Sequence, residues 1–192
     1  MNRTKCWMVC LLLSGLGGSA LFADATQKNE NASLGDPGLH VSFELNRPRG
    51  RVYRKPYVAV WLEDDDGFPV KTGVLWWMTE QPGPRWHRDL TRWYRNDRLR
   101  KSVEKTDLVD GISGATRGPG QYQTHFDGTD NAGKRLPNGK YFLCLEAARE
   151  KGTYKIIRHP FVWSDQPIAS TELSGNLEIS QASFSLVPLA PE

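Results

Sequence analysis

The stretch from residue 57 to residue 78 constrains the fold of this chain more than any other part of the sequence. YVAVWLE (57–63) is rich in β-branched and aromatic residues, and FPVKTGVLWWM (68–78) resumes the same character. Between them, the Asp-Asp-Asp-Gly segment at 64–67 is a strong turn signal. Two strand-like runs around a tight turn predict a β-hairpin over residues 57–78.

Further strand-like runs follow one another along the chain, with Gly- and Pro-containing turns between them. LHVSFEL (39–45) alternates with a period of two, and the other runs are residues 120–128, 140–150, 153–163 and 177–187. Short strands at regular spacing are typical of a β-sandwich. The chain has 192 residues, which is the size of a single domain. We therefore predict an all-β fold, an immunoglobulin-like antiparallel β-sandwich at 39–187, followed by a C-terminal tail at 188–192.

One segment has helical rather than strand periodicity. In RWHRDLTRWYRNDRLRKS (85–102), three apolar residues and three arginines each recur at i, i+4 and i+7 on different faces, namely Trp86, Leu90, Trp93, Arg88, Arg92 and Arg95. This spacing predicts one short amphipathic helix at about residues 86–96, lying across one end of the sandwich. Its arginines either face solvent above a buried tryptophan face or meet an anionic cofactor, partner or surface.

The first 25 residues have the order of parts found in a secretory signal peptide. A basic start precedes the apolar run CWMVCLLLSGLGGSALF, and Ala-Asp-Ala at 23–25 provides a cleavage site. We therefore predict a signal peptide at 1–25, a polar flexible leader at 26–38 and a periplasmic mature protein without a membrane span. An uncleaved anchor is the alternative, but the run is short for a span and contains three glycines.

Charge and cysteine content exclude several classes of protein. The formal net charge is +3, and loss of the predicted signal removes Arg3, Lys5 and Asp24, which leaves +2. This balance gives no general attraction to nucleic acid or anionic membrane, and export argues against nucleic acid even for the arginine-rich helix.

Cys144 is the one cysteine outside the predicted signal, so it has no partner for an internal disulfide. It is either a small buried hydrophobe or a reactive thiol.

No catalytic or metal-binding constellation is evident in the sequence. The four histidines are scattered, and there is no G-x-S-x-G, H-E-x-x-H or Walker motif. The acidic segments EDDDG (63–67) and DGTDNAG (127–133) offer oxygen ligands that suit calcium, but EDDDG lacks the spaced ligands of an EF-hand loop, and both fit turns better. We therefore expect no metal site and no enzyme with a substrate of its own.

The Gly-rich stretch DGISGATRGPG (110–120) is too poor in apolar side chains to pack a core, and it predicts a loop. Its first seven residues resemble the acceptor motif for covalent FMN on extracytosolic proteins. That motif is an Asp, a small residue, two variable positions, a small residue and then Ala-Thr or Ser-Thr. A separate FAD:protein FMN transferase attaches FMN to the threonine hydroxyl as a phosphoester. The resemblance implies that Thr116 carries FMN.

The neighbours of Thr116 take their roles from the same resemblance. Asp110 gives the transferase a charge to recognise, or it orients the loop. Gly111, Gly114 and Ala115 keep the loop slim enough to enter the active site of another enzyme.

Other residues near the attachment point complete the predicted site. Ser113 is the second hydroxyl of the motif, three residues before the expected attachment. Arg117 follows the attachment point directly and is placed to pair with the phosphate. Trp86, Trp93 or Tyr94 of the predicted helix are candidates to cover a face of the flavin ring.

The rest of the chain resembles one bacterial family over residues 39–187, nearly the whole predicted domain. The segments YVAVWLED, RDLTRWYR, DGISGATRGPGQY and LPNGKYFLCLEAAREKGTY occur in that order. The family consists of predicted periplasmic proteins of unknown function, and the resemblance implies a β-sandwich that occurs with flavin transferases and PepSY-type membrane redox proteins. HFDGTDNAGKRLPNGKYFL also resembles the immunoglobulin-like domain of flagellar hook-capping proteins, which supports the sandwich but indicates no function.

Two functions follow from these observations. The first is a periplasmic electron-transfer protein that carries FMN on Thr116, with the FAD:protein FMN transferase and a PepSY-type membrane redox protein as partners. The alternative is a cofactor-free exported immunoglobulin-like binding or scaffold module, in which residues 110–120 are only a glycine-rich connection.

Cleavage of the predicted signal peptide is expected after Ala25, with cleavage after Ala23 as the alternative. N-terminal sequencing of protein isolated from the periplasm should therefore begin at Thr26. A native chain that still begins at Met1 in the membrane fraction would show that this segment is an anchor.

Overall fold

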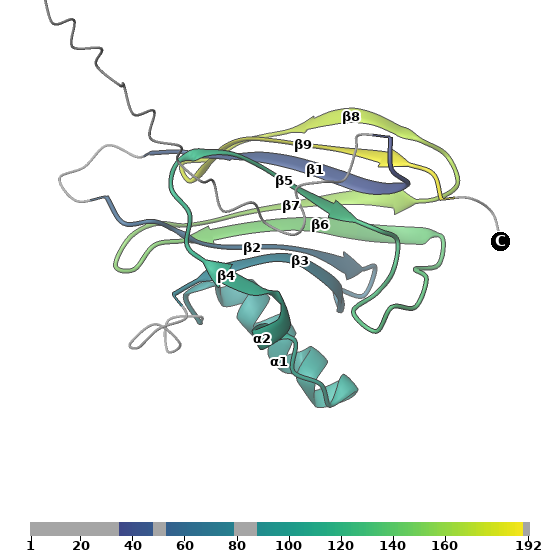
Figure 1. Cartoon of the computed structure of the whole chain (residues 1–192), viewed down its shortest axis with the longest axis horizontal. Coiled ribbons are helices and arrows are strands. Elements are labelled where there is room, and N and C mark those ends of the chain that lie inside the picture. The colour runs from purple at the N-terminus through teal and green to yellow at the C-terminus, as the bar shows by residue number, and fades with distance from the viewer. Residues whose placement is uncertain (1–34, 48–52, 79–87, 190–192) are drawn as a thin grey trace, which may run out of the picture.

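The computed structural model describes residues 35–47, 53–78 and 88–189, and it leaves out the side chain of Asp110. Within these residues two β-sheets pack face to face, and helices lie on the outer side of one of them (Figure 1). The predicted signal peptide and most of the leader fall outside the described residues. The arrangement confirms the predicted all-β sandwich with one main helix.

The sheets differ in size and in strand direction. The smaller sheet is antiparallel and has four strands, in the order β5 (Gly120–Phe126), β1 (Gly38–Leu45), β9 (Ile179–Val187) and β8 (Ile168–Leu173). The larger sheet has five strands, in the order β4 (Ser113–Ala115), β3 (Pro69–Trp77), β2 (Tyr57–Asp64), β6 (Gly139–Ala148) and β7 (Tyr154–Trp163). The pairings β2–β3, β2–β6 and β6–β7 are antiparallel as predicted, and β4 runs parallel to β3, which makes the larger sheet mixed. The predicted hairpin is confirmed as the antiparallel pair β2 and β3.

The inner core between the sheets follows from alternation along the strands. In β1, Leu39, Val41, Phe43 and Leu45 are all at most 3 % exposed, whereas Ser42 lies on the outer face. This is the burial pattern of a strand with one face against a core and one toward solvent.

The central strand β2 is buried on both of its faces, unlike β1. Its alternate side chains pack into two separate apolar clusters, the inner core (Val58, Val60, Leu62) and a helix-facing cluster (Tyr57, Ala59, Trp61). The larger sheet therefore needs a second cover on its outer side.

Helices α1 (Thr91–Glu104) and α2 (Val109–Ile112) provide that cover (Figure 1). Leu90, directly before α1, is 0 % exposed and Trp93 is 2 % exposed, and both pack in the helix-facing cluster. The predicted helix is confirmed, but α1 is shifted toward the C-terminus from the predicted 86–96, and its predicted place across one end of the sandwich was wrong. The helix begins at Thr91 and covers a sheet face, because the apolar outer face of the larger sheet is where its tryptophan is buried.

The stretch 110–120 was predicted to be a loop and is only partly irregular. Its first residues belong to α2, and β4 adds to the edge of the larger sheet beside β3. Backbone pairing forms this strand without apolar side chains, so the hydrophobic pattern of the sequence carries no sign of it.

The start of α1 is capped by a residue from the sheet. Leu90 at the N-cap has no side-chain acceptor, and the buried carboxylate of Glu146 on β6 takes its place. Glu146 accepts hydrogen bonds from the backbone N–H groups of Arg92 at 2.9 Å and Trp93 at 2.8 Å. These groups have no intrahelical partner at a helix start, so the sheet satisfies them. Burial raises the pKa of Glu146, and the two N–H groups oppose that rise.

Glu63 of β2 is the centre of a buried polar cluster between α1 and the larger sheet. Its carboxylate accepts hydrogen bonds from Arg92 (2.8 and 2.7 Å), Asn96 (2.6 Å), Arg158 (2.9 Å) and Trp61 (3.1 Å). Burial opposes ionisation of Glu63, but the hydrogen bonds from the two arginines outweigh it and hold the pKa of Glu63 below its ordinary value. One carboxylate therefore joins the helix to β2 and β7.

Replacement of Glu63 by Gln should destabilise the fold by about 3 kcal/mol, because two arginines lose the counter-ion that holds them against the sheet. Glu172→Gln is the control, since Glu172 is an exposed carboxylate without an ion pair among the described residues, and it should change stability by less than about 0.5 kcal/mol. Urea unfolding followed by tryptophan fluorescence measures both variants. Equal effects of the two substitutions would contradict the central position of Glu63.

Candidate functional site

The predicted acceptor motif, residues 110–116, lies at the edge of the larger sheet. Its first part is in α2, and its second part is β4, which pairs in parallel with residues 75–77 of β3. Thr116 is the first residue after β4 and is half-buried. Its hydroxyl is therefore carried at the point where the paired strand ends and an irregular segment, 116–119, begins.

Helix α2 anchors this segment on its N-terminal side. The backbone N–H of Val109 donates to Asp107 Oδ1 at 3.0 Å, and this bond together with the ammonium of Lys101 lowers the pKa of Asp107. Val109 and Ile112 pack against the helix-facing cluster. The backbone of Asp110 lies in α2, but its side chain is not described, so its recognition role stays a prediction.

Gly111 stands at a position where the described fold does not require glycine. Its φ angle lies outside the left-handed region, and a Cβ added to it would meet no atom within 4 Å among the described residues. Glycine inside a helical turn costs about 0.5–1 kcal/mol relative to alanine. Neither backbone geometry nor packing within the described residues therefore explains why glycine is present.

Arg117 and two aromatic rings anchor the segment on its C-terminal side. The guanidinium of Arg117 lies 4.7 Å from the ring centroid of Trp76 and 5.5 Å from that of Tyr122. The two rings meet edge to face at 4.8 Å. The Tyr122 hydroxyl also donates to the carbonyl oxygen of Gly118 at 2.9 Å. Thr116 is thus flanked by an ordered cationic and aromatic cluster.

Two of the three predicted flavin-contact aromatics are described, and both lie in or against the helix-facing cluster. Trp86 lies outside the described residues. Trp93 is 2 % exposed in the helix-facing cluster, where its indole N–H donates to Thr72 Oγ1 at 3.4 Å. Tyr94 is half-buried against the same cluster, beneath the guanidinium of Arg98.

Trp76 and Tyr122 are the aromatic residues that sequence reasoning missed. The alternation in GQYQTHF places Tyr122 on the same strand face as Thr124 and Phe126, which are both buried. That pattern predicts an inward ring at position 122. The meeting of this ring with Trp76 and Arg117 depends on the packing of two different sheets, for which a single sequence has no signal.

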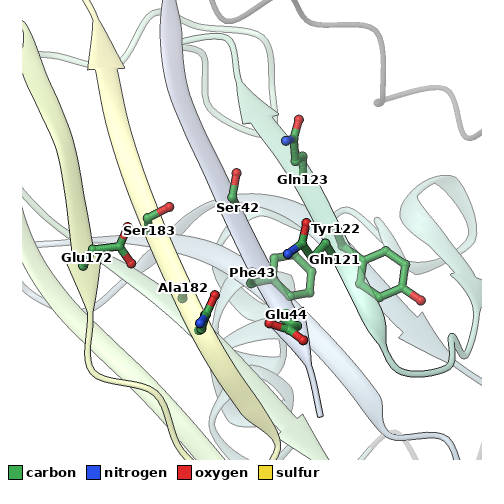
Figure 2. Close-up of a pocket in the computed structure, with 10 residues that line it drawn as sticks. Ser42, Phe43, Glu44, Gln121, Tyr122, Gln123, Glu172, Ala182 and Ser183 are labelled. Carbon is green, nitrogen blue, oxygen red and sulfur yellow. The ribbon is translucent and has the colours of Figure 1, made fainter.

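A second candidate surface is the outer face of the smaller sheet, where a shallow pocket has a volume of about 170 Å³ (Figure 2). Cross-strand register arranges its polar side chains in two rows, Gln121–Glu44–Gln181 and Gln123–Ser42–Ser183, and Glu172 extends the second row. Among the described residues, the side chains in these rows make no hydrogen bond to one another or to other groups. No lysine or arginine of the described residues lines the pocket.

The acidic turns use their carboxylates within the chain. Asp64 accepts from the backbone N–H of Phe68, and Asp130 accepts from those of Ala132 and Lys134, each at 2.8 Å. These bonds support the turn interpretation. In the part of the chain that the structure describes, no three or more His, Cys, Asp or Glu side chains group to hold a metal ion.

Cys144 is a buried apolar residue rather than a reactive thiol. Its side chain is 0 % exposed in the helix-facing cluster. Burial, with a smaller contribution from Glu63, raises the pKa of the Cys144 thiol far above its ordinary value. The nucleophilic thiolate is therefore disfavoured, which confirms the first of the two sequence interpretations.

The fold and the segment at its edge define a β-sandwich protein with one helix-covered sheet. The chain belongs to the family described as "Predicted periplasmic protein (DUF2271)", whose model matches residues 38–181. This membership confirms the family resemblance and the periplasmic location. No curated protein and no solved structure matches the chain. Over the described residues, no helix combines the length and apolar character needed to cross a membrane.

Replacement of Tyr122 by Phe removes the hydroxyl that holds Gly118 and should increase amide hydrogen exchange across residues 116–120, at a cost of about 1 kcal/mol. Tyr141→Phe is a matched control, because Tyr141 also donates to a carbonyl four residues earlier, that of Pro137, at 2.8 Å. The control should loosen the Pro137 turn and leave 116–120 unchanged. Unaltered exchange at 116–120 in Tyr122→Phe would show that this hydroxyl does not order the segment.

Proposed function

We propose that this periplasmic protein is an electron carrier with FMN attached to Thr116 as a phosphoester. The proposal rests on the acceptor motif and on one structural observation, the glycine at position 111. Nothing in the described fold requires a small residue there, whereas an enzyme that must close around the segment does. A covalent link also suits a periplasmic carrier, because a dissociated flavin would be diluted away.

The position of the motif is compatible with modification by another enzyme. β4 has only three residues and is paired on one side, to β3. Its release from the edge therefore breaks few hydrogen bonds and opens neither apolar cluster. Ile112 and Tyr122 anchor the chain on either side of Thr116, so the transferase needs to displace only the short segment between them while it contacts the exposed Gly111 on α2.

FAD is the flavin donor in the transfer reaction. The Thr116 oxygen attacks the phosphorus on the FMN side of the pyrophosphate, and the bond from this phosphorus to the bridging oxygen breaks. AMP leaves with the electron pair, and the hydroxyl proton passes to a base of the transferase. The products are AMP and the FMN phosphoester of Thr116.

The cluster beside Thr116 provides suitable contacts for the attached group. Stacking on Trp76 and Tyr122 uses the face of the Arg117 guanidinium, while phosphate pairing uses N–H groups in its plane. The same residue can therefore hold its place on the rings and pair with the phosphate. The flavin then supplies the redox chemistry, with a PepSY-type membrane redox protein as the expected partner.

A second candidate function is that of a cofactor-free binding module, and the polar pocket in Figure 2 favours it. Two carboxylates, Glu44 and Glu172, lie there among amide and hydroxyl groups without an opposing cation in the lining. Such a surface suits a neutral ligand rich in hydroxyl groups, to which it offers donors and acceptors together. In that case residues 110–120 only connect α2 to β5.

Intact-mass spectrometry after co-expression with a flavin transferase tests the first function. Wild type should gain the mass of FMN less one water, and Thr116→Ala should gain nothing while losing less than about 0.5 kcal/mol of stability. Modification of Thr116→Ala would move the attachment to another residue, with Ser113 the first candidate. If wild type gains no mass under conditions that modify a known acceptor, the binding-module function replaces the carrier.

A pair of glycine variants separates enzyme recognition from folding. Gly111 and Gly118 both have open space where a Cβ would stand, and neither has a left-handed φ, but only Gly111 is within the motif. Gly111→Gln should fold normally and lose most of its flavin loading, because the motif requires a small residue at that position, whereas Gly118→Gln should load like wild type. Equal loading of the two variants would show that the transferase does not read position 111.

A further inference from the structure

A basic depression lies on the outer side of the larger sheet, beside the start of α1. It has a volume of about 250 Å³ and is lined by Thr91, Arg92, Arg95, Tyr154, Ile156 and Arg158. Three of these six residues are arginines, contributed by α1 and β7. The depression borders β7, which forms the edge of the sheet opposite to β4, so it is separate from the segment that carries Thr116.

Two of the arginines are held in place by the buried Glu63 carboxylate. Arg92 donates to it through Nε and Nη2, and Arg158 donates through Nε. The Arg158 guanidinium also stacks at 3.3 Å from the ring centroid of Phe142. Among the described residues, Nη1 and Nη2 of Arg158 have no recorded acceptor. Their donors are therefore ordered before any ligand arrives, which lowers the entropic cost of binding.

The charge of this region is not balanced within the protein. Glu63 offsets one of the three arginines, and Arg95 is exposed and makes no ion pair among the described residues. Glu146, the other carboxylate beneath the depression, is fully buried behind the helix start and accepts the two N–H groups there. The depression therefore keeps a positive charge that faces solvent.

The lining also has an apolar part. Ile156 and the ring of Tyr154 lie beside the arginines, and both belong to β7. A bare ion would leave this surface wet, whereas an ester with a hydrocarbon or aromatic body would cover it. Guanidinium groups pair best with phosphate and carboxylate oxygens.

We propose that this depression is an oxyanion-binding site, formed by Arg92, Arg95 and Arg158, that favours a phosphate ester with an apolar body. The site does not depend on covalent flavin at Thr116, from which it is separated by the width of the sheet. Arg95 supplies the solvent-facing donor, while Arg92 and Arg158 form the ordered base of the site.

Titration of the purified protein, followed by NMR of the arginine Nε–H signals, tests the site. The probes are inorganic phosphate, phenyl phosphate and benzoate. Saturable shifts are expected for the Nε–H signals of Arg92 and Arg158, with phenyl phosphate binding more tightly than inorganic phosphate because of the apolar lining. Phenyl phosphate should also bind more tightly than benzoate, and tighter binding of benzoate would overturn the preference for a phosphate ester.

Two exposed arginines of α1 provide a matched comparison that leaves the Glu63 cluster intact. Arg95→Gln should weaken binding of phenyl phosphate about fivefold or more, and Arg98→Gln, which changes an arginine outside the lining, should not weaken it. The absence of saturable shifts in wild type would overturn the proposal. Equal weakening by both substitutions would also overturn the proposal, because the loss of binding would then come from the lower positive charge of α1 as a whole and not from the depression.

Discussion

The buried carboxylate of Glu63 is the interaction on which the arrangement of this protein most depends. It lies at 0 % exposure between a sheet and a helix and accepts hydrogen bonds from α1, β2 and β7. A carboxylate in that position is costly unless it is fully paired, and the two arginines make it so. Together with Glu146, which satisfies the start of α1, it fixes where the helix lies on the sheet.

This helix layer has consequences at both edges of the larger sheet. At one edge α2 continues the layer, packs the half-buried Ile112 against the helix-facing cluster and leads the chain into β4, so Thr116 comes directly after a paired strand. At the other edge, the arginines that neutralise Glu63 also form the basic depression. The same buried cluster therefore orders a surface for anions, while apolar packing of α2 places the predicted flavin acceptor.

The two sheets divide the surface of the molecule between them. Among the described residues, no helix covers the outer face of the smaller sheet, where the polar rows line a shallow pocket (Figure 2). The larger sheet has both of its faces buried along β2. Candidate sites for a neutral ligand, a covalent cofactor and an oxyanion thus lie on different parts of one sandwich.

The sequence by itself determined the elements whose pattern is local: the alternating strands, the hairpin at 57–78, the existence of a helix rich in arginine, and the motif that ends at Thr116. Tertiary structure alone decided the rest. β8 is a mostly exposed edge strand and β4 consists of small residues, so neither has an apolar period to predict it. The sequence left Arg92 facing either solvent or an anionic cofactor, partner or surface, because helical periodicity cannot show that the carboxylate of Glu63 lies on the sheet below. Arg117 meets Trp76 and Tyr122 only when strands far apart in the sequence pack together, since such contacts are set by the burial of whole sheets and not by the residues beside them in the chain.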